Sequence, residues 1–499
     1  MLELFYKKIL ENLKSTNIFY KYNSEKYSYK DVNIFFNIFL ETLNTLKSKK
    51  QNKICTLSNK SFNFYACVVS ILLSNNIWIP LSSSFPSKRI IRILHVLKPH
   101  IIFCDKENFH KIKNLDIQKL NIKIVELEQF NIKSKNADII TSYDLSKSHK
   151  LEDLAMIFFT SGSTGEPKGV PIKQKNFLPC FFGQYERFYK NKSNLVFADF
   201  HDSSFVISIV IILPSIYTKS AICPAKSSLD FFKPLSHIKQ NKINAIVTVP
   251  SFINQFKNFT LDKIKTIDLE ILILCGETFY LQTLEYIFKN IKSKKVFNCY
   301  GSTEVSPWVF SYECKNKDIK KFKHQGVVPI GKKFDYTEIK CLKEELLVSG
   351  ESVVDGYLDE KLSREKFLHS NGKNWYLTGD LVKNVNGNYF IYGRKDSLIK
   401  IQGYRVELLD IDTKIRLLKE VKNCLVFAVS INDYKKMIFA AIETTSSLQE
   451  KTIREHLKKL LPNYMIPGVI TLHEKFPINK NGKLDRRKLI EFCKDNYKK

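Results

Sequence analysis

A run of glycine and hydroxyl residues follows an apolar stretch near residue 160 and ends at a lysine. The run reads Phe159-Thr-Ser-Gly-Ser-Thr-Gly-Glu-Pro-Lys-Gly-Val170. Glycines let the backbone approach an oxyanion closely, and successive free N–H groups form an anion-binding concavity. The hydroxyls add donors, and Lys168 adds a point charge. The run predicts a phosphate-binding loop, although it lacks the G-K-[ST] ending of a Walker A loop. A surface turn is the commonest alternative for this composition.

This run resembles the signature loop of the adenylate-forming superfamily, which comprises acyl-CoA synthetases, luciferases and the amino-acid adenylation domains of nonribosomal peptide synthetases. Other motifs of that superfamily occur in order along the chain, from Trp78-Ile-Pro-Leu to Asn479-Lys-Asn-Gly-Lys-Leu-Asp-Arg486. The resemblance therefore covers nearly the whole chain. It implies that ATP is a substrate and that its phosphates are bound by Thr160, Ser161, Gly162, Ser163, Thr164, Gly165 and Lys168.

Asn298-Cys-Tyr-Gly-Ser-Thr-Glu304 is similar to the aromatic-Gly-x-Thr-Glu motif of the superfamily. By that resemblance Tyr300 offers a flat face to adenine, Gly301 permits a tight turn, and Thr303 offers a hydroxyl to the α-phosphate. Glu304 would be the ligand of Mg²⁺, a cation that binds through one or two carboxylates plus substrate phosphates. Asn298, Cys299 and Ser302 complete this part of the predicted nucleotide site.

Two further motifs supply the rest of the predicted nucleotide site. Trp375-Tyr-Leu-Thr-Gly-Asp-Leu381 resembles the Thr-Gly-Asp motif, in which Asp380 would accept hydrogen bonds from the ribose hydroxyls. An Asp in a hairpin turn is the plain alternative. Arg394 would add a ribose or phosphate contact. Cys275-Gly-Glu277 resembles the segment that lines the adenine pocket, which places Gly276 and Glu277 there.

Lys483 matches the catalytic lysine near the C-terminal end in this superfamily. Carboxylate attack on the α-phosphate brings two anions together, and a fixed cation between them stabilises the transition state. Because the carboxylate is already a nucleophile, no general base is needed. The stretch from Gly393 to Glu407 resembles the hinge and the loop beyond it, with Asp396 as the hinge residue. Without the resemblance, one lysine among so many would be assigned to the solvated surface.

His201-Asp-Ser-Ser-Phe205 aligns with a motif in which an Asp holds the ammonium of an amino-acid substrate. Asp202 is the corresponding residue here, and a carboxylate in an apolar pocket needs such a cation partner. The alternative is an Asp that caps the start of a helix. In this alignment Val206 and Trp308 limit the volume of the pocket, which favours a substrate with a small side chain. The aligned lining residues are Ser203, Val206, Cys275, Cys299, Pro307 and Trp308.

Short apolar runs rich in Ile and Val alternate with helical patterns and must position these motifs. Lys53–Leu57, Ile101–Cys104, Ala155–Phe159, Ala245–Val249 and Leu269–Leu274 are typical of strands buried on both faces. The alternation predicts an α/β fold of parallel-rich sheets covered by helices.

After about residue 335 the pattern changes. Leu346–Gly350 and Tyr389–Gly393 predict short strands of a β-barrel-like subdomain. Helices are expected near 408–418 and 449–461, the latter stopped by Pro462. We expect a large adenylation domain over residues 1–395 and a small, mobile α+β domain over 396–499 that carries the lysine.

Composition narrows the class of protein further. The 499 residues carry a net charge of +29, but the lysines are scattered and no RNA-binding signature organises them. We therefore expect no nucleic-acid partner, although steering toward an acidic carrier protein stays possible. Eleven cysteines without a C-x-x-C pair indicate a reduced, cytoplasmic setting. The longest apolar stretch, Val206–Leu213, is too short to span a bilayer and should form a buried strand or helix.

The sequence thus predicts adenylation of a small amino acid and its transfer to a phosphopantetheine thiol. Because no carrier domain follows Lys483, an acyl or peptidyl carrier protein would act in trans. The segment Cys275-Gly-Glu277 and the length resemble the D-alanine–carrier-protein ligases. An acyl- or aryl-CoA ligase is the main alternative, and a degenerate ATP-binding scaffold is a third. Asp202 argues against a CoA ligase, because a neutral acid has no use for a carboxylate there. The joint presence of Lys168, Glu304, Asp380 and Lys483 argues against a degenerate scaffold.

Overall fold

The computed structural model describes most of the chain. The described residues are 1–44, 51–132, 149–161, 167–256, 267–395, 398–401, 404–430, 436–445, 447–461, 465–479 and 484–498. Every structural statement below refers to these ranges. We call the described residues from 1 to 395 the N-terminal unit and those from 398 to 498 the C-terminal unit.

The first sheet of the N-terminal unit has six strands in the order β6-β5-β3-β4-β7-β8. All neighbouring strands are parallel except β8, which is antiparallel to β7. The strands are β3 (Lys53–Leu57), β4 (Ile77–Pro80), β5 (Ile101–Cys104), β6 (Lys123–Glu126), β7 (Leu154–Ser161) and β8 (Pro167–Lys173).

The second sheet has nine strands in the order β17-β16-β15-β13-β11-β9-β10-β1-β2. Its six central strands, from β15 to β1, are parallel, and antiparallel strands lie at both edges. The strands are β1 (Ile18–Tyr22), β2 (Glu25–Ser28), β9 (Val196–Asp199), β10 (Ala221–Pro224), β11 (Ala245–Thr248), β13 (Ile271–Cys275), β15 (Val296–Tyr300), β16 (Phe310–Glu313) and β17 (Lys332–Lys333).

Helices connect and cover these strands. One apolar cluster contains buried residues of both sheets, such as Phe158 on β7 and Phe197 on β9, together with Phe177 and Ile211 from two of the helices. The two sheets therefore share a core. The helices are α1 (Leu2–Asn12), α2 (Tyr29–Asn44), α3 (Phe62–Leu73), α4 (Ser87–Leu97), α5 (Lys106–Lys113), α6 (Gln174–Gln184), α7 (Ile209–Tyr217), α8 (Ser228–Phe232), α9 (Pro234–Gln240), α10 (Pro250–Gln255), α12 (Leu281–Asn290), α13 (Asp318–Lys321) and α14 (Glu360–Lys366).

A third, antiparallel sheet completes the N-terminal unit. Its strands run in the order β18-β19-β21-β20, and β22 pairs with β21. The described strands form an open sheet and do not close into a barrel. They are β18 (Thr337–Leu342), β19 (Glu345–Gly350), β20 (Phe367–Ser370), β21 (Lys373–Val385) and β22 (Asn388–Arg394).

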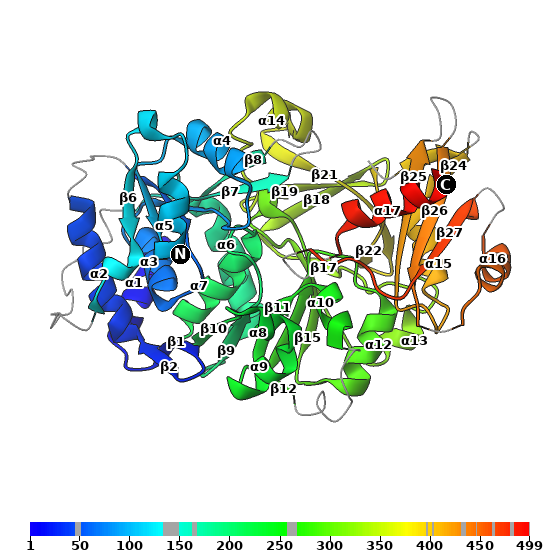
Figure 1. The fold of residues 1–499 in the computed structure, drawn as a ribbon, viewed down its shortest axis with the longest axis horizontal. Coiled ribbons are helices and arrows are strands. Elements are labelled where there is room, and N and C mark those ends of the chain that lie inside the picture. Colours follow the sequence, from blue (N-terminus) through cyan, green and yellow to red (C-terminus); the bar gives the residue numbers. More distant parts are fainter. Residues whose placement is uncertain are drawn as a thin grey trace.

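The C-terminal unit, orange to red in Figure 1, lies to one side of the N-terminal unit. It has its own apolar clusters, around Ile411, Val426 and Ile453 and around Phe439 and Cys493. Its α+β character is therefore confirmed, whereas the boundary at residue 396 stays a prediction. Its elements are β23 (Leu398–Ile401), β24 (Tyr404–Glu407), α15 (Leu408–Ile415), β25 (Asn423–Ser430), β26 (Lys436–Glu443), α16 (Glu450–Lys458), β27 (Val469–His473) and α17 (Arg486–Lys498).

The α/β class predicted from the sequence is confirmed, with small differences in the elements. The run Leu269–Leu274 divides into β12 (Asp268–Leu269) and β13, because β12 pairs with β14 (Lys292–Ser293) in a separate ladder. The stretch from Val206 is helical. The helix α16 ends before Pro462, which lies outside the described residues. Within the described residues, no helix combines the length and apolar character that crossing a bilayer would need.

Candidate active site

The carboxyl ends of four parallel strands meet at one edge of the nine-stranded sheet. The strands β9, β11, β13 and β15 are hydrogen-bonded neighbours, and Cys275 at the end of β13 pairs with Cys299 near the end of β15. The loops that follow parallel strands leave the sheet on the same side. The fold thus gathers segments that lie far apart in the sequence, among them His201–Phe205 and Gly276–Thr278.

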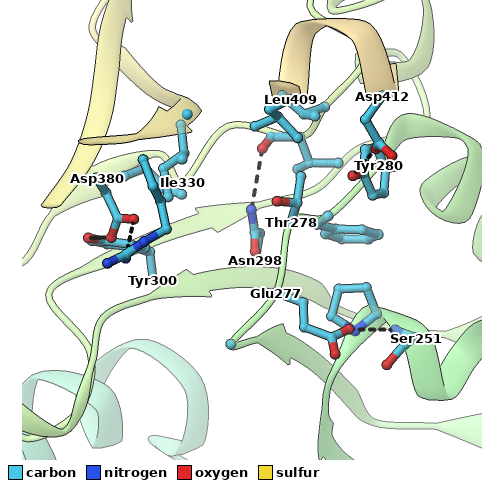
Figure 2. A pocket seen from close by; sticks show the side chains of 18 of the residues that line it. Ser251, Glu277, Thr278, Tyr280, Asn298, Tyr300, Ile330, Asp380, Leu409 and Asp412 are labelled. Carbon is cyan, nitrogen blue, oxygen red and sulfur yellow. Dashed lines mark hydrogen bonds and ion pairs between the residues drawn. The ribbon is translucent and has the colours of Figure 1, made fainter. Parts of the chain in front are cut away.

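A pocket of about 640 Å³ opens at this edge, between the two units. Its walls come from loops of the nine-stranded sheet, from β21 and β22, and from the C-terminal unit (Figure 2). Four separate motifs of the predicted nucleotide site therefore share one pocket. The predicted residues in its lining are Gly276, Glu277, Asn298, Cys299, Tyr300, Gly301, Ser302, Asp380 and Arg394.

Asp380 is held by two neighbours across the pocket wall. Its carboxylate accepts a 2.6 Å hydrogen bond from the Tyr300 hydroxyl and a 2.7 Å charged contact from Arg394 (Figure 2). Burial, reinforced by the Asp380 charge, raises the pKa of Tyr300 well above its usual value, so the phenol keeps its proton and donates. These contacts hold the Asp380 carboxylate in the pocket wall.

Gly276 and Glu277 form the opposite wall. Gly276 has a φ of +75°, a conformation that L side chains rarely adopt, which explains why glycine stands there. The Glu277 carboxylate accepts a 3.0 Å hydrogen bond from the backbone N–H of Ser251, in the first turn of α10. Asn298 donates to the backbone carbonyl of Pro329 at 2.9 Å. These contacts fix the wall before any ligand binds.

Glu304, the predicted Mg²⁺ ligand, is buried in the short helix η8 (Thr303–Val305) with Thr303 beside it. The Tyr357 hydroxyl donates to its carboxylate at 2.8 Å. The ammonium of Lys168 lies 5.5 Å from the centre of the same Tyr357 ring. The predicted phosphate-loop lysine and the predicted metal ligand are thus brought to two sides of one tyrosine.

The donor set fits Mg²⁺. Among the described residues no three His, Cys, Asp or Glu side chains cluster as a protein-only metal site. Mg²⁺ does not require such a cluster, because it is commonly held by one or two carboxylates plus substrate phosphates. Glu304 supplies one such carboxylate, held in place by the hydrogen bond from Tyr357.

Gly301 links the nucleotide motif to the predicted acid-binding residues. A Cβ on Gly301 would lie 1.9 Å from the carbonyl oxygen of Pro307 and 2.8 Å from the Cα of Trp308. Only glycine permits this approach. Trp308 is buried, and its carbonyl accepts a 2.7 Å hydrogen bond from the Tyr336 hydroxyl.

Asp202 accepts hydrogen bonds from residues that follow strands of both sheets. Its carboxylate accepts from the backbone N–H of Ser204 at 2.9 Å, from the Ser204 hydroxyl at 2.7 Å and from the Ser82 hydroxyl in a short contact. Ser82 comes from the loop after β4 in the six-stranded sheet. The contacts to Ser204 form a local turn and not the helix cap considered above, because the short helix that follows (Val206–Ser208) has Phe205 as its N-cap. The contact to Ser82 is additional to this turn.

A buried ion pair fixes the strand end that leads to Asp202. Asp199 ends β9, is 1% exposed, and pairs with Lys60 at 2.8 Å. The Tyr65 hydroxyl donates to the same carboxylate at 2.6 Å. Lys60 and Tyr65 follow β3 of the other sheet, so this network joins the two sheets next to Asp202.

The predicted acid-binding residues divide between several places. Of that set, Cys299 lines the main pocket, whereas Pro307 borders a cavity of about 10 Å³ next to α6 and α7. Burial raises the pKa of the Cys299 thiol well above its usual value, so it acts as an apolar wall. The remaining residues, Asp202, Ser203, Val206, Cys275 and Trp308, are not in the lining of either cavity.

Several predicted residues lie outside the described ranges. These are Gly162, Ser163, Thr164 and Gly165 of the phosphate loop, the hinge residue Asp396 and the catalytic lysine Lys483. Their flanks are described. Thr160 and Ser161 end β7, and Thr160 pairs with Lys168 on β8. Asn479, Leu484 and Arg486, on both sides of Lys483, line the main pocket.

Two supporting residues were not singled out from the sequence. Tyr357 holds Glu304 from 53 positions away, and Ser82 holds Asp202 from 120 positions away. Neither residue stands in a local pattern that points to its partner. Both contacts arise because the chain returns to the same place in three dimensions.

The structure is an α/β fold with a pocket lined by residues of both units. The family model of the AMP-binding enzyme matches residues 11–358. The chain therefore belongs to the AMP-binding enzyme family, whose reaction class is that of ATP-dependent, AMP-forming ligases.

Similar proteins agree with this assignment. The chain is 29% identical over 424 residues to a D-alanine–D-alanyl carrier protein ligase of Staphylococcus epidermidis, covering 83% of this chain and 84% of the relative. It is 30% identical over 428 residues to the ligase of that name from Staphylococcus aureus strain Newman, with the same coverage. The crystal structure of IdnL7 superposes with a TM-score of 0.84 at 20% identity, covering 99% of both chains.

Proposed function

We propose that this chain uses ATP and Mg²⁺ to adenylate a small amino acid and then transfers the aminoacyl group to the phosphopantetheine thiol of a carrier protein in trans. The observation that carries the proposal is the composition of the main pocket. Tyr300 and Asp380 of the N-terminal unit share it with Asn479, Leu484 and Arg486, the neighbours of Lys483. The presence of these flanking residues in the pocket supports a role for Lys483 at a nucleotide bound by Tyr300 and Asp380.

The first half-reaction requires little chemistry from the protein beyond charge and position. The substrate carboxylate attacks the α-phosphorus, the bond to the β-phosphate oxygen breaks, and pyrophosphate leaves. Asp380 would accept hydrogen bonds from the ribose, and Thr303 would donate to the α-phosphate. Lys483 would stand between the two reacting anions and stabilise the charge that builds on the phosphoryl oxygens.

Glu304 is the residue that would hold Mg²⁺, whose contribution when bound is to neutralise charge on the leaving phosphates. Tyr357 donates to the Glu304 carboxylate and so fixes the direction of its oxygens. Lys168 would add a second positive charge on the phosphate side of this tyrosine.

An amino-acid substrate is supported by Asp202 and by the names of the relatives. Asp202 is a carboxylate that three donors hold in place at the carboxyl ends of the strands. These donors use three of about four acceptor positions and leave room for an ammonium. The two staphylococcal relatives are named for D-alanine and for a carrier protein. The proposal for this chain is a small amino acid and a carrier protein partner.

ATP–pyrophosphate exchange over a panel of amino, fatty and aryl acids tests the proposal. We expect exchange with one or a few small amino acids and none with fatty or aryl acids. Exchange that occurs only with fatty or aryl acids would assign the chain to the acyl- or aryl-CoA ligases instead. Loading of a phosphopantetheinylated carrier protein, followed by intact-protein mass spectrometry, tests the second step with coenzyme A as the competing acceptor.

A further inference from the structure

A tyrosine and an ion pair join the two units at the rim of the main pocket. Tyr280, just before α12, belongs to the N-terminal unit. Asp412 on α15 and Arg416 just after it belong to the C-terminal unit. All three line the pocket, and Figure 2 shows Tyr280 directed at Asp412.

The C-terminal side of this contact is rigid. Arg416 Nε donates to Asp412 Oδ1 at 2.8 Å, and both side chains are less than a tenth exposed. The guanidinium also donates to Asn423 Oδ1 at 3.2 Å and to the Cys424 carbonyl at 2.5 Å. The start of β25 therefore fixes the guanidinium within its own unit, independently of the N-terminal unit.

The N-terminal side meets this fixed pair in two ways. The Tyr280 hydroxyl donates to Asp412 Oδ1 in a short contact. The Arg416 guanidinium carbon lies 3.9 Å from the centre of the Tyr280 ring, a cation–π arrangement. Burial raises the pKa of Tyr280 well above its usual value, so the hydroxyl keeps its proton for donation.

Other contacts between the two units lie beside this one, and α15 also packs near β22 of the N-terminal unit. Gln282 donates to the Val421 carbonyl at 3.1 Å, and Gly326 lies against Thr413. A Cβ placed on Gly326 would be 3.3 Å from the Thr413 Cβ. A contact made of two polar links around one buried ion pair can separate as a whole, unlike a broad apolar interface.

We infer that Tyr280 is a positioning residue that docks on the Asp412–Arg416 pair and holds the C-terminal unit in the arrangement that permits adenylation. The inference rests on the proposed function, because the same arrangement brings the segment around Lys483 to the nucleotide pocket. The adenylation step needs this contact, whereas transfer from an adenylate already formed does not.

Tyr280 is the residue to substitute, because loss of its side chain should leave the Asp412–Arg416–Asn423 interactions of the C-terminal unit intact. Tyr280→Ala removes both links, and Tyr280→Phe removes the hydrogen bond but keeps the ring under Arg416. Asp410→Asn is the matched control, because it alters an exposed i,i+4 pair with Lys414 on the same helix.

Each variant is assayed for two rates. The first is ATP–pyrophosphate exchange with the preferred acid, and the second is single-turnover transfer from synthetic aminoacyl adenylate to a phosphopantetheine thiol. For Tyr280→Ala we expect about a tenfold loss of exchange, with transfer within about twofold of wild type. For Tyr280→Phe we expect about a threefold loss of exchange, and for Asp410→Asn no change. Equal loss of both rates in Tyr280→Ala would overturn the inference.

Hydrogen–deuterium exchange of the ligand-free chain provides a readout that does not depend on activity. Tyr280→Ala should speed amide exchange in α15 relative to wild type and Asp410→Asn, while the strands of the nine-stranded sheet keep their protection. Unchanged exchange in α15 would overturn the docking role. Wild-type chain that exchanges pyrophosphate with no acid would instead contradict the proposed function, and the deuterium result would still decide whether the contact docks the two units.

Discussion

The nucleotide side and the acid side of this protein are built differently. The nucleotide pocket is an open space whose polar groups bind one another across its walls, as Tyr300 and Arg394 do with Asp380. The predicted acid-binding residues lie at strand ends and in the turns and short helices beyond them, and their one charge, Asp202, is held by two hydroxyl groups and a backbone N–H. The predicted nucleotide side therefore offers paired polar groups around an open space, whereas the predicted acid side offers a single carboxylate.

This difference has a physical basis. ATP brings many charges and hydrogen-bonding groups, and a wide pocket with paired polar residues can receive them without leaving any group unsatisfied. A small amino acid brings one ammonium group and little apolar surface. Selectivity for it must come from a close-packed wall and from one fixed opposite charge.

The largest effect is expected from substitution of Lys483, which we propose acts on both substrates. Lys483→Ala takes away the cation that we propose lies between the carboxylate and the α-phosphate. We expect exchange to fall by at least about a hundredfold, because the charge in the transition state loses its fixed partner. ATP binding, measured by calorimetry, should stay measurable. Exchange near the wild-type rate would remove Lys483 from the mechanism.

The next largest effect should be confined to the acid side. Asp202→Asn keeps the size and the acceptor of the side chain but removes its charge, so an ammonium loses its partner. We expect about a hundredfold loss in kcat/KM for the amino acid, with the KM for ATP within twofold of wild type. Asp268→Asn, at an exposed ion pair with Lys292, is the charge-matched control. Equal loss for ATP and amino acid would contradict an acid-side role.

The reciprocal change tests the nucleotide side. Asp380→Asn removes a charged acceptor that also binds Tyr300 and Arg394. We expect the KM for ATP to rise about tenfold while the KM for the amino acid changes little, since hydrogen bonds to a charged group contribute most. Steady-state kinetics with each substrate varied in turn measures both values. A rise confined to the amino acid would reverse the assignment of the two sides.

The smallest effect is expected from loss of the hydrogen bond that Ser82 donates to Asp202 on the acid side. Ser82→Ala removes one of the three donors to Asp202, while both Ser204 contacts remain. We expect about a threefold rise in the KM for the amino acid without a change in KM for ATP. Ser83→Ala, at an exposed position of the same loop, is the control. If both variants behave alike, the loop and not the hydrogen bond is responsible.

The sequence predicted the nucleotide side more completely than the acid side. Tyr300 and Asp380 stand in short motifs whose residue types follow from the chemistry of a ribose and a base. They share one pocket as expected. The acid side depends on which residues pack beside Asp202, and packing joins positions far apart in the chain. Ser82 and the Lys60–Asp199–Tyr65 network could not be predicted from any local pattern.

By itself, the sequence determined the α/β alternation, the order of the motifs and the residue types that can bind a nucleotide. These properties are local, because strand and helix patterns and glycine-rich turns depend on neighbouring residues. Only the tertiary structure decided that Tyr357 holds Glu304, that Ser82 holds Asp202 and that Tyr280 meets Asp412 and Arg416. Such contacts arise from the packing of whole sheets and units, in which residues more than fifty positions apart become neighbours.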